Sequence, residues 1–511
     1  MPSTAPRLLL IGLDAADPEL IDRWTSDGTL PNLAALRRAG ISGRLASSAQ
    51  HLAGSPWPTF YTGQPPSQHG LYHDYQWRAE SMGFAAPGED WLSLSPFWRH
   101  LGARVSSVIY DMPMALGMEP FNGVEVAGWA AHDKLAPPAS HPADLLSEIK
   151  RRFGEWHIGP ESYGAVSAAE LLELRDQLRD GVRRSTDLAL WLLERPWNLA
   201  IVAFGALHRG GHRLFDRTSI AGAATKAQGA SFDGALRELY VECDAALGRL
   251  VAAAPDATVI AFSVHGMMAN TARVDLLEDM LARVLNGNSS AHPKRGMMRR
   301  FGEAIPTEWR RAITARVPRA FRERLVNRWA TGGIAWDRTR AFTLRADLQG
   351  YVRLNLQGRE RQGIVPPASV AALRDQIAEG LLTFRDAATG EPLIAAIEPI
   401  DGLFPDGNRR DNLPDIVVRW SDAPAAPHVA VESPRFGRIE RATPGRIPNG
   451  RSGNHRGEGF IIARGPGIAA GARLGATPHI LDLAPTVVRL LGTTSSVPLA
   501  GRVLPELVGS V

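Results

Sequence analysis

The chain has 511 residues, which is too long for one simple core and favours one large α/β domain with insertions, or two to three domains. Apolar residues make up 44% and charged residues 22% of it, as in an ordinary globular enzyme. The formal net charge of +4 permits an anionic substrate but does not indicate a nucleic-acid-binding protein.

The single cysteine, Cys243, excludes internal disulfides and cysteine-based metal sites, and it fits a reducing compartment. The apolar run near the N-terminus, residues 8–11, is too short for a signal peptide and is soon followed by Asp14 and Asp17. No window approaches the roughly 20 apolar residues that a membrane span needs. We therefore expect a soluble, cytoplasmic protein without a transmembrane segment.

The first predicted strand covers residues 7–13, an apolar run that ends in Gly-Leu-Asp. In open α/β sheets, functional groups collect just beyond the carboxyl ends of the strands, which is where Asp14 stands. A helix is predicted over 18–26, so the alternative is that Asp14 is only the N-cap of this helix. A second helix is predicted over 33–39.

Ser55 and Pro56 form a strong helix-start signal, with serine at the N-cap and proline at the first helical position. The free N–H groups and the positive dipole potential at a helix start favour a phosphate-like anion. The Ser55 hydroxyl is therefore either a cap or a nucleophile, and the sequence alone slightly favours the cap. Residues 64–72 are predicted to form a turn, and residues 74–96 a surface loop or a wall that faces the substrate.

Two histidines follow the apolar run 199–202, which is predicted to be a buried parallel strand. His208 and His212 are four residues apart, so on a helical turn both imidazoles share a face and reach one metal ion. Gly210 and Gly211 between them permit close approach of backbone, metal or substrate. The alternative is a pair of ordinary loop histidines, and the pair alone does not decide between the two.

Two more histidines stand beside predicted strands. His265 follows the apolar run 257–263, so it stands at the carboxyl end of a strand. His455 lies in a predicted glycine-bearing loop, 451–456, that leads into the strand 460–463.

The remaining predicted elements also follow an α/β pattern. Strands are predicted at 105–110, 124–127, 341–343, 350–356 and 415–420, and helices at 143–153, 167–193, 232–253, 370–384 and 480–491.

Residues 286–333 differ in composition from the rest of the chain. They contain few β-branched residues and many arginines, with Trp309 and Trp329 interleaved, and are predicted to form a basic helical insertion. Such a run is usually a solvated helical face, which we favour. The alternative is a lid that draws an anionic or membrane-surface substrate.

Seven motifs in order resemble the alkaline phosphatase superfamily, and most closely its type I phosphodiesterase/nucleotide pyrophosphatase branch. They are G-L-D-A-A-D (12–17), P-T-F-Y-T-G with S-Q-H-G (58–70), H-R-G-G-H (208–212), S-V-H-G-M (263–267), Y-V-R-L-N-L-Q-G-R-E (351–360), G-N-H-R-G-E-G (453–459) and I-L-D-L-A-P-T-V-V-R-L-L-G (480–492). The resemblance implies an α/β fold with a mainly parallel central sheet flanked by helices. Residues 1–285 and 334–511 would form its catalytic domain, interrupted by the insertion 286–333.

The resemblance also implies two metal sites on one side of the sheet. His208, His212 and His455 match the first of them, and His208 stands where the family usually has an aspartate. Three histidines are a sound set of Zn²⁺ ligands that leaves one position for water or substrate.

The second implied site is incomplete. Asp14 and His265 match it, but Val264 stands where a second aspartate is expected, and valine cannot bind a metal. We therefore expect one or two zinc ions. The nucleophile position of the family falls near Ala53, which has no hydroxyl, so Ser55, two residues away, is the predicted nucleophile.

By this resemblance the protein would be a metal-dependent hydrolase of phosphate esters, either a phosphodiesterase or a phosphomonoesterase, acting on a small anionic ester. Zinc would polarise the phosphoryl group, and Ser55 or a metal-bound hydroxide would attack it. One alternative is a sulfate or phosphonate ester hydrolase or a phosphoryl transferase on the same fold. Another is a catalytically weak binding protein that has lost part of the metal centre. Nucleic-acid binding is not expected.

Overall fold

The computed structural model describes residues 6–88, 95–115, 118–131, 135–156, 158–159, 161, 164–287, 327, 331–332, 334–441, 445 and 447–509. The predicted basic insertion, 286–333, falls outside the described residues except for 286–287, 327 and 331–332. Within the part of the chain that the structure describes, no helix combines the length and the apolar composition that crossing a bilayer requires.

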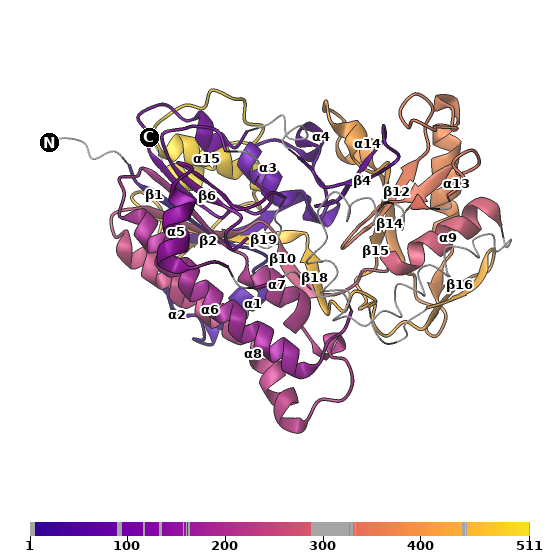
Figure 1. Cartoon of the computed structure of the whole chain (residues 1–511), viewed down its shortest axis with the longest axis horizontal. Coiled ribbons are helices and arrows are strands. Elements are labelled where there is room, and N and C mark those ends of the chain that lie inside the picture. The colour runs from indigo at the N-terminus through magenta and orange to yellow at the C-terminus, as the bar shows by residue number, and fades with distance from the viewer. Residues whose placement is uncertain are drawn as a thin grey trace.

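A nine-stranded sheet forms the centre of the molecule, in the order β20-β2-β19-β9-β1-β8-β5-β6-β7 (Figure 1). Five neighbouring strands are parallel: β9 (Thr258–Ser263), β1 (Leu8–Leu13), β8 (Leu199–Phe204), β5 (Ser107–Tyr110) and β6 (Gly123–Ala127). Toward the edges lie β19 (Glu458–Arg464), β2 (Ile41–Ala46) and β7 (Ala139–His141), each in antiparallel pairing, and β20 (Ala472–Arg473), parallel to β2. The predicted mainly parallel sheet is confirmed.

Helices cover both faces of this sheet, because the strand side chains alternate between two apolar sides. Leu9 and Ile11 belong to one core cluster, while Leu8 and Leu10 belong to the other. The first face packs against α2 (Pro31–Arg38), α5 (Leu145–Phe153), α6 (Ala168–Leu193) and α8 (Lys226–Ala253). The second packs against α3 (Pro56–Thr62) and α15 (Leu483–Leu490).

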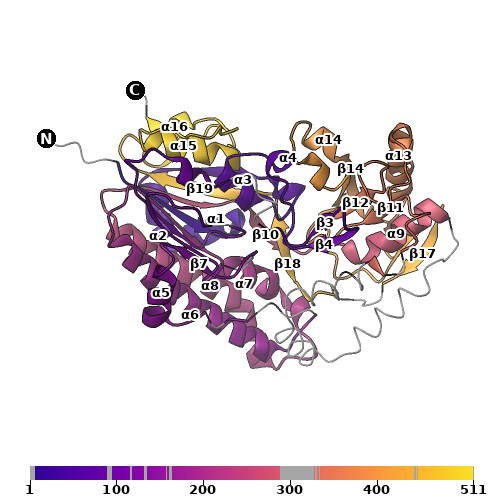
Figure 2. The same cartoon turned by 45° about the horizontal axis from the view of Figure 1, so that its top comes forward.

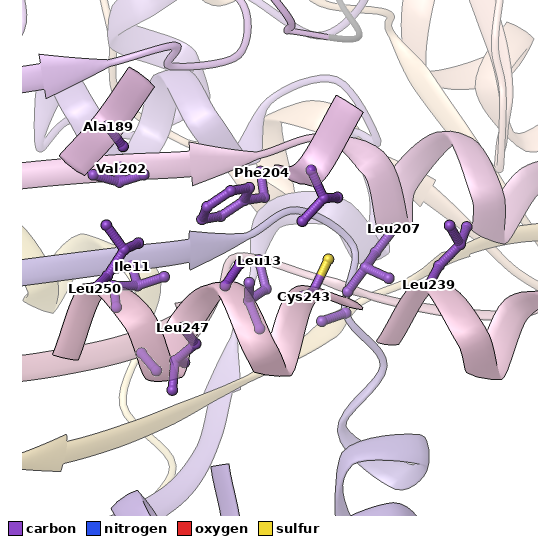
Figure 3. Packing of buried hydrophobic residues seen from close by; sticks show 14 of the residues in the cluster. Ile11, Leu13, Ala189, Val202, Phe204, Leu207, Leu239, Cys243, Leu247 and Leu250 are labelled. Atoms are coloured by element: carbon purple, nitrogen blue, oxygen red, sulfur yellow. The ribbon is translucent and has the colours of Figure 1, made fainter. Parts of the chain in front are cut away.

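Figure 3 shows how α8 packs beneath the central strands. Leu247 and Leu250 of α8 lie against the side of the sheet that carries Ile11 and Val202. The single cysteine, Cys243, is buried in the same layer, and burial raises the pKa of its thiol. It therefore acts as a small apolar core residue.

A smaller lobe lies beside the main sheet (Figures 1 and 2). Its antiparallel sheet has the order β11-β12-β15-β14, and its helices pack against that sheet. The elements are β11 (Ala341–Thr343), β12 (Gly350–Leu354), β15 (Ile416–Trp420), β14 (Ile394–Pro399), α9 (Val274–Asn286) and α13 (Val370–Leu381). Between this lobe and the main sheet lies the antiparallel pair β10 (Gly266–Ala269) and β18 (Gly453–Arg456).

Three local predictions were wrong. The predicted loop 74–96 contains a hairpin of β3 (Gln76–Arg78) and β4 (Gly83–Ala85), and the predicted turn 64–72 contains the short helix α4 (Pro66–His69). The predicted loop 451–456 is largely strand β18. Its partner β10 is about 190 residues earlier in the chain, so no local pattern marks it as a strand.

Candidate metal centre

Asp14 lies at the point where the main sheet ends. Its backbone N–H donates to the carbonyl oxygen of Phe204, the last residue of β8, at 3.0 Å. The next residue, Ala15, has a φ of 59°, a left-handed conformation that turns the chain sharply after the strand. The helix that follows, α1 (Pro18–Ser26), is capped by Asp17, whose side chain accepts from two N–H groups of its first turn. The alternative of Asp14 as the cap was therefore wrong.

Helix α7 (Ala206–Leu214) carries His208 and His212 on one face. Its two internal glycines allow tight packing of the helix against its neighbours. A Cβ atom at Gly210 would lie 2.3 Å from the side chain of Leu239 on α8, and one at Gly211 would lie 2.8 Å from Met267 on β10. The glycines thus bring α7 against α8 and β10, because any larger residue would push the helix away.

The four predicted histidines and Asp14 come together, all of them buried. His265 lies two residues beyond the end of β9, and His455 lies on β18 opposite Met267 of β10. The Nε2 atoms of His208 and His212 are 3.1 Å apart, and those of His208 and His455 are 3.0 Å apart. His208, His212 and His455 therefore bring three Nε2 atoms close together, and this group of donors could hold a metal ion.

The other ring nitrogens of two of these histidines face acceptors. His208 Nδ1 lies 2.8 Å from Asp14 Oδ2, and His212 Nδ1 lies 2.9 Å from the carbonyl oxygen of Gly453. Burial alone would raise the pKa of Asp14, but His208 and His265 outweigh it and lower the pKa to about 2, so the carboxylate is ionised. A carboxylate and a carbonyl can only accept hydrogen bonds, so both Nδ1 atoms carry a proton.

The Nδ1 protons of His208 and His212 leave a position between these two rings that favours a metal cation. Burial, with the nearby positive groups, lowers the pKa of His212 and His455 well below the ordinary value, so both rings are neutral near pH 7. A neutral ring with its proton on Nδ1 presents an unprotonated Nε2. His208 and His212 both carry their proton on Nδ1, so when both rings are neutral their Nε2 lone pairs face each other at 3.1 Å and repel unless a metal ion lies between them. The donor set of three imidazoles is one that Zn²⁺ accepts.

Asp14, His208 and His265 form a second, overlapping group of donor atoms. His265 Nε2 lies 3.6 Å from Asp14 Oδ1, which is too long for a hydrogen bond. The indole N–H of Trp57 donates to the same Oδ1 at 2.7 Å. Val264 points into the apolar core and offers no donor atom.

Sequence reasoning missed a set of charged residues beside the histidines. The Arg451 guanidinium donates to both carboxylate oxygens of Glu161, at 2.7 and 3.3 Å, and to Asp347 Oδ1 at 3.0 Å. Asp347 also pairs with His73 at 3.2 Å. Burial alone would lower the pKa of His73, but Asp74 and Asp347 outweigh it and raise the pKa to about 10. No spacing signal marks these residues, because they come from four distant segments.

Ser55 stands at the N-cap position of α3, but its hydroxyl makes no capping hydrogen bond. It donates instead to the Leu52 carbonyl oxygen at 2.7 Å and lies 2.6 Å from Ser48 Oγ. The side chain is fully buried. The interpretation of this hydroxyl as a cap was therefore wrong, while its role as a nucleophile stays a prediction.

His69 is a buried neutral histidine behind α3. Its Nδ1 accepts from the Leu71 N–H at 3.0 Å, so its Nε2 carries the proton and donates to Thr59 Oγ1 at 3.0 Å. Burial lowers the pKa of His69 to about 3. The ring therefore resists protonation for as long as the protein stays folded.

We expect His69 to make the folded protein less stable in mild acid. Below about pH 6.5 the unfolded chain binds a proton at this residue and the folded chain does not, so the stabilisation present above pH 6.5 is lost progressively toward pH 3. The loss is about 1.4 kcal/mol per pH unit. Denaturant unfolding between pH 6 and pH 4 should show a shallower pH dependence for His69→Gln than for the wild type, and equal slopes would contradict this account.

Comparison with known proteins is consistent with this site. A family model described as type I phosphodiesterase / nucleotide pyrophosphatase matches residues 8–424. No curated protein matches the chain.

Several solved structures are similar to this chain at low sequence identity. Inactive murine ectonucleotide pyrophosphatase / phosphodiesterase 5 in complex with AMP is 11% identical, with 97% of each chain covered and a TM-score of 0.46. The human protein of the same name is 12% identical, with 97% of each chain covered and a TM-score of 0.45. Phosphonoacetate hydrolase from Sinorhizobium meliloti 1021 in complex with phosphonoformate is 12% identical, with 95% of this chain and 96% of the other covered and a TM-score of 0.49.

The family match covers β1, α3, α7 and β9, and with them four of the five residues of the centre. The chain therefore belongs to the type I phosphodiesterase / nucleotide pyrophosphatase family, and it is a phosphoric ester hydrolase.

Proposed function

We propose that the protein is a zinc-dependent hydrolase of small anionic phosphate esters, with His208, His212 and His455 as metal ligands. The observation that carries the proposal is the convergence of three buried Nε2 atoms, with His208 Nε2 3.1 and 3.0 Å from the other two. In two of the three rings, those of His208 and His212, the Nδ1 proton points at an acceptor, so each of these rings presents its Nε2 to the centre.

Three imidazoles are neutral ligands, so the charge of a bound ion is not offset by the residues that touch it. Bound Zn²⁺ would supply Lewis acidity toward a phosphoryl oxygen. The chain's own residues keep the ligands in place: Asp14 holds the ring of His208, and the Gly453 carbonyl holds that of His212. Asp14 and His265 are proposed to belong to the same centre.

We also propose that residues 1–285 and 334–511 form one catalytic domain. The support is that the first range contributes His208 and His212 and the second contributes His455. Tyr351 of β12 further links the smaller lobe to the segment before α3, because its hydroxyl accepts from the Ala53 N–H at 3.2 Å.

The attacking group is either Ser55 or a water molecule. Attack by Ser55 would require its hydroxyl to leave the Leu52 carbonyl oxygen, which favours water. We therefore expect Ser55→Ala to keep its turnover number within about tenfold of the wild type. A loss of about 10³-fold or more would identify Ser55 as the nucleophile. Thr62→Ala on the same helix is the matched control, because Thr62 donates to the Pro58 carbonyl oxygen at 2.6 Å.

The class of ester is tested with four nitrophenyl substrates: the phosphate monoester, the phosphate diester, a phosphonate ester and the sulfate ester. Each is assayed with the protein as purified, after treatment with a chelator, and after Zn²⁺ is restored. Hydrolysis of a phosphate ester that is lost on chelation and returns with Zn²⁺ supports the proposal. Preference for the phosphonate or sulfate ester would reassign the substrate. A protein that contains no metal and hydrolyses none of the four would contradict the proposal.

A further inference from the structure

The position of Asp14 relative to His208 determines how many metal ions the centre can hold. His208 takes part in both groups of donor atoms. Its Nε2 faces His212 and His455, while its Nδ1 lies 2.8 Å from Asp14 Oδ2. This distance is that of a charge-assisted N–H···O hydrogen bond. For His208 to serve both groups, its ring would have to lose both protons and bridge two ions.

Without His208, the second group has too few ligands. Asp14 and His265 remain, and two protein ligands do not make a zinc site. At position 264, where the resemblance expects an aspartate, Val264 lies in the apolar core and its side chain offers no ligand atom. Among the described residues, only these two overlapping groups bring ligand atoms of three His, Cys, Asp or Glu side chains within 4.8 Å of one another.

Both oxygens of Asp14 are already engaged by hydrogen-bond donors. Trp57 Nε1–H donates to Oδ1 at 2.7 Å, and His208 Nδ1–H donates to Oδ2. The carboxylate is fully buried, so these two donors stabilise its charge where water does not reach. A carboxylate that accepts from the far nitrogen of a metal-ligating histidine fixes the ring and makes the ligating nitrogen more basic.

We propose that the protein holds one metal ion, on His208, His212 and His455, and that Asp14 is a positioning residue that acts on the metal through His208. This inference rests on the metal site of the proposed function. In this proposal Asp14 does not bind the metal itself. The proposal also explains why a histidine can stand at position 208. Where the family usually has an aspartate, this chain has a histidine backed by the Asp14 carboxylate, so the negative charge lies one residue farther from the metal.

His265 then has a packing role. Its ring lies against that of His455, with centroids 4.3 Å apart and planes inclined by 37°. It contributes to the wall that holds the His455 ring in place. Its replacement should therefore leave the number of bound metal ions unchanged.

Metal stoichiometry tests the proposal directly. The full-length protein is stripped with a chelator and titrated with Co²⁺, which is followed by visible absorbance, and the Zn²⁺-loaded protein is dialysed and analysed for its elements. We expect saturation at one equivalent of Co²⁺ and one zinc per chain. Two equivalents would overturn the one-metal proposal while leaving a metal-dependent hydrolase intact. No binding would overturn both the inference and the metal site on which it rests.

Variants test the role of each residue. Asp14→Asn should still bind one equivalent of Co²⁺, but about 10- to 100-fold more weakly, because asparagine lacks the charge that makes His208 more basic. His265→Gln should bind one equivalent with an affinity within about threefold of the wild type. Undiminished affinity in Asp14→Asn would overturn the positioning role. Loss of one of two equivalents in a variant would show that the residue replaced in it is a metal ligand.

Asp17→Asn is the matched control, because it makes the same change three residues away. Asp17 lies at the start of α1 and pairs with Arg456 Nε at 3.4 Å, so the loss of its charge should lower the thermal midpoint without changing Co²⁺ affinity. If Asp14→Asn does not fold, His265→Gln and the wild-type stoichiometry still decide between one ion and two. A chain that binds one ion but hydrolyses no phosphate ester would contradict the proposed function and leave this inference standing.

Discussion

Replacing His212 with alanine is expected to abolish metal binding and to lower phosphate ester hydrolysis by about 10³-fold or more. His212 contributes one of three Nε2 atoms, and its removal leaves His208 and His455 alone. Two imidazoles bind zinc too weakly to keep it at ordinary concentrations. A metal that polarises a phosphoryl oxygen supplies several kcal/mol of transition-state stabilisation, and about 1.4 kcal/mol corresponds to a factor of ten in rate.

Elemental analysis and steady-state kinetics of the purified variant measure this effect. His479→Ala is the matched control, since His479 caps the short 3-10 helix Ile480–Asp482 by accepting from the Leu481 N–H at 3.2 Å. That variant should lose about 1 kcal/mol of stability and keep its metal. A His212→Ala protein that retains a full equivalent of metal would contradict the assignment of the ligands.

Replacing Arg353 with methionine is expected to destabilise the protein by about 3–5 kcal/mol. Arg353, on β12, is buried and donates to Glu360 Oε1 at 2.8 Å and to the carbonyl oxygens of Asp411 and Leu413 at 2.7 and 2.6 Å. Methionine fills a similar volume but makes none of these bonds. The Glu360 carboxylate, which is also fully buried, would lose one of its two arginine partners and keep only Arg359, at 3.0 Å.

The free energy of unfolding of Arg353→Met, measured by denaturant titration, tests this expectation. Arg438→Met is the control, because Arg438 pairs with Glu440 while both side chains are more than half exposed. An exposed pair contributes at most about 1 kcal/mol. If both variants lost the same free energy of unfolding, the expectation that the buried ion pair contributes more than the exposed one would be wrong.

The Arg353 cluster also bears on the site. Trp77, in the hairpin of β3 and β4, donates to Glu360 Oε2 at 2.8 Å, so the cluster ties that hairpin to the smaller lobe. The same segments contribute His73 and Asp347 to the charged residues beside the histidines. We therefore expect a destabilised Arg353→Met protein to lose hydrolytic activity at lower denaturant concentrations than those at which the main sheet unfolds.

Much of the fold and most of the centre could be predicted from the sequence, because both depend on short-range patterns. Continuous apolar runs identified β1, β8 and β9, and strands buried on both faces have this composition. The ends of adjacent parallel strands meet at one edge of the sheet. Asp14, His208 and His265, each just beyond such a strand, were therefore expected at one place, and the structure brings them together there.

Contacts between distant segments decided the rest. The conformation of His455 depends on pairing with β10, and the Ser55 hydroxyl turns to Leu52 and Ser48 instead of capping its helix. The hydrogen bond between Asp14 and His208 joins residues 194 positions apart. That bond determines which nitrogen of His208 is protonated and therefore which faces the metal. Spacing along the chain carries no information about such a bond, because it depends on tertiary packing that brings β1 and α7 together.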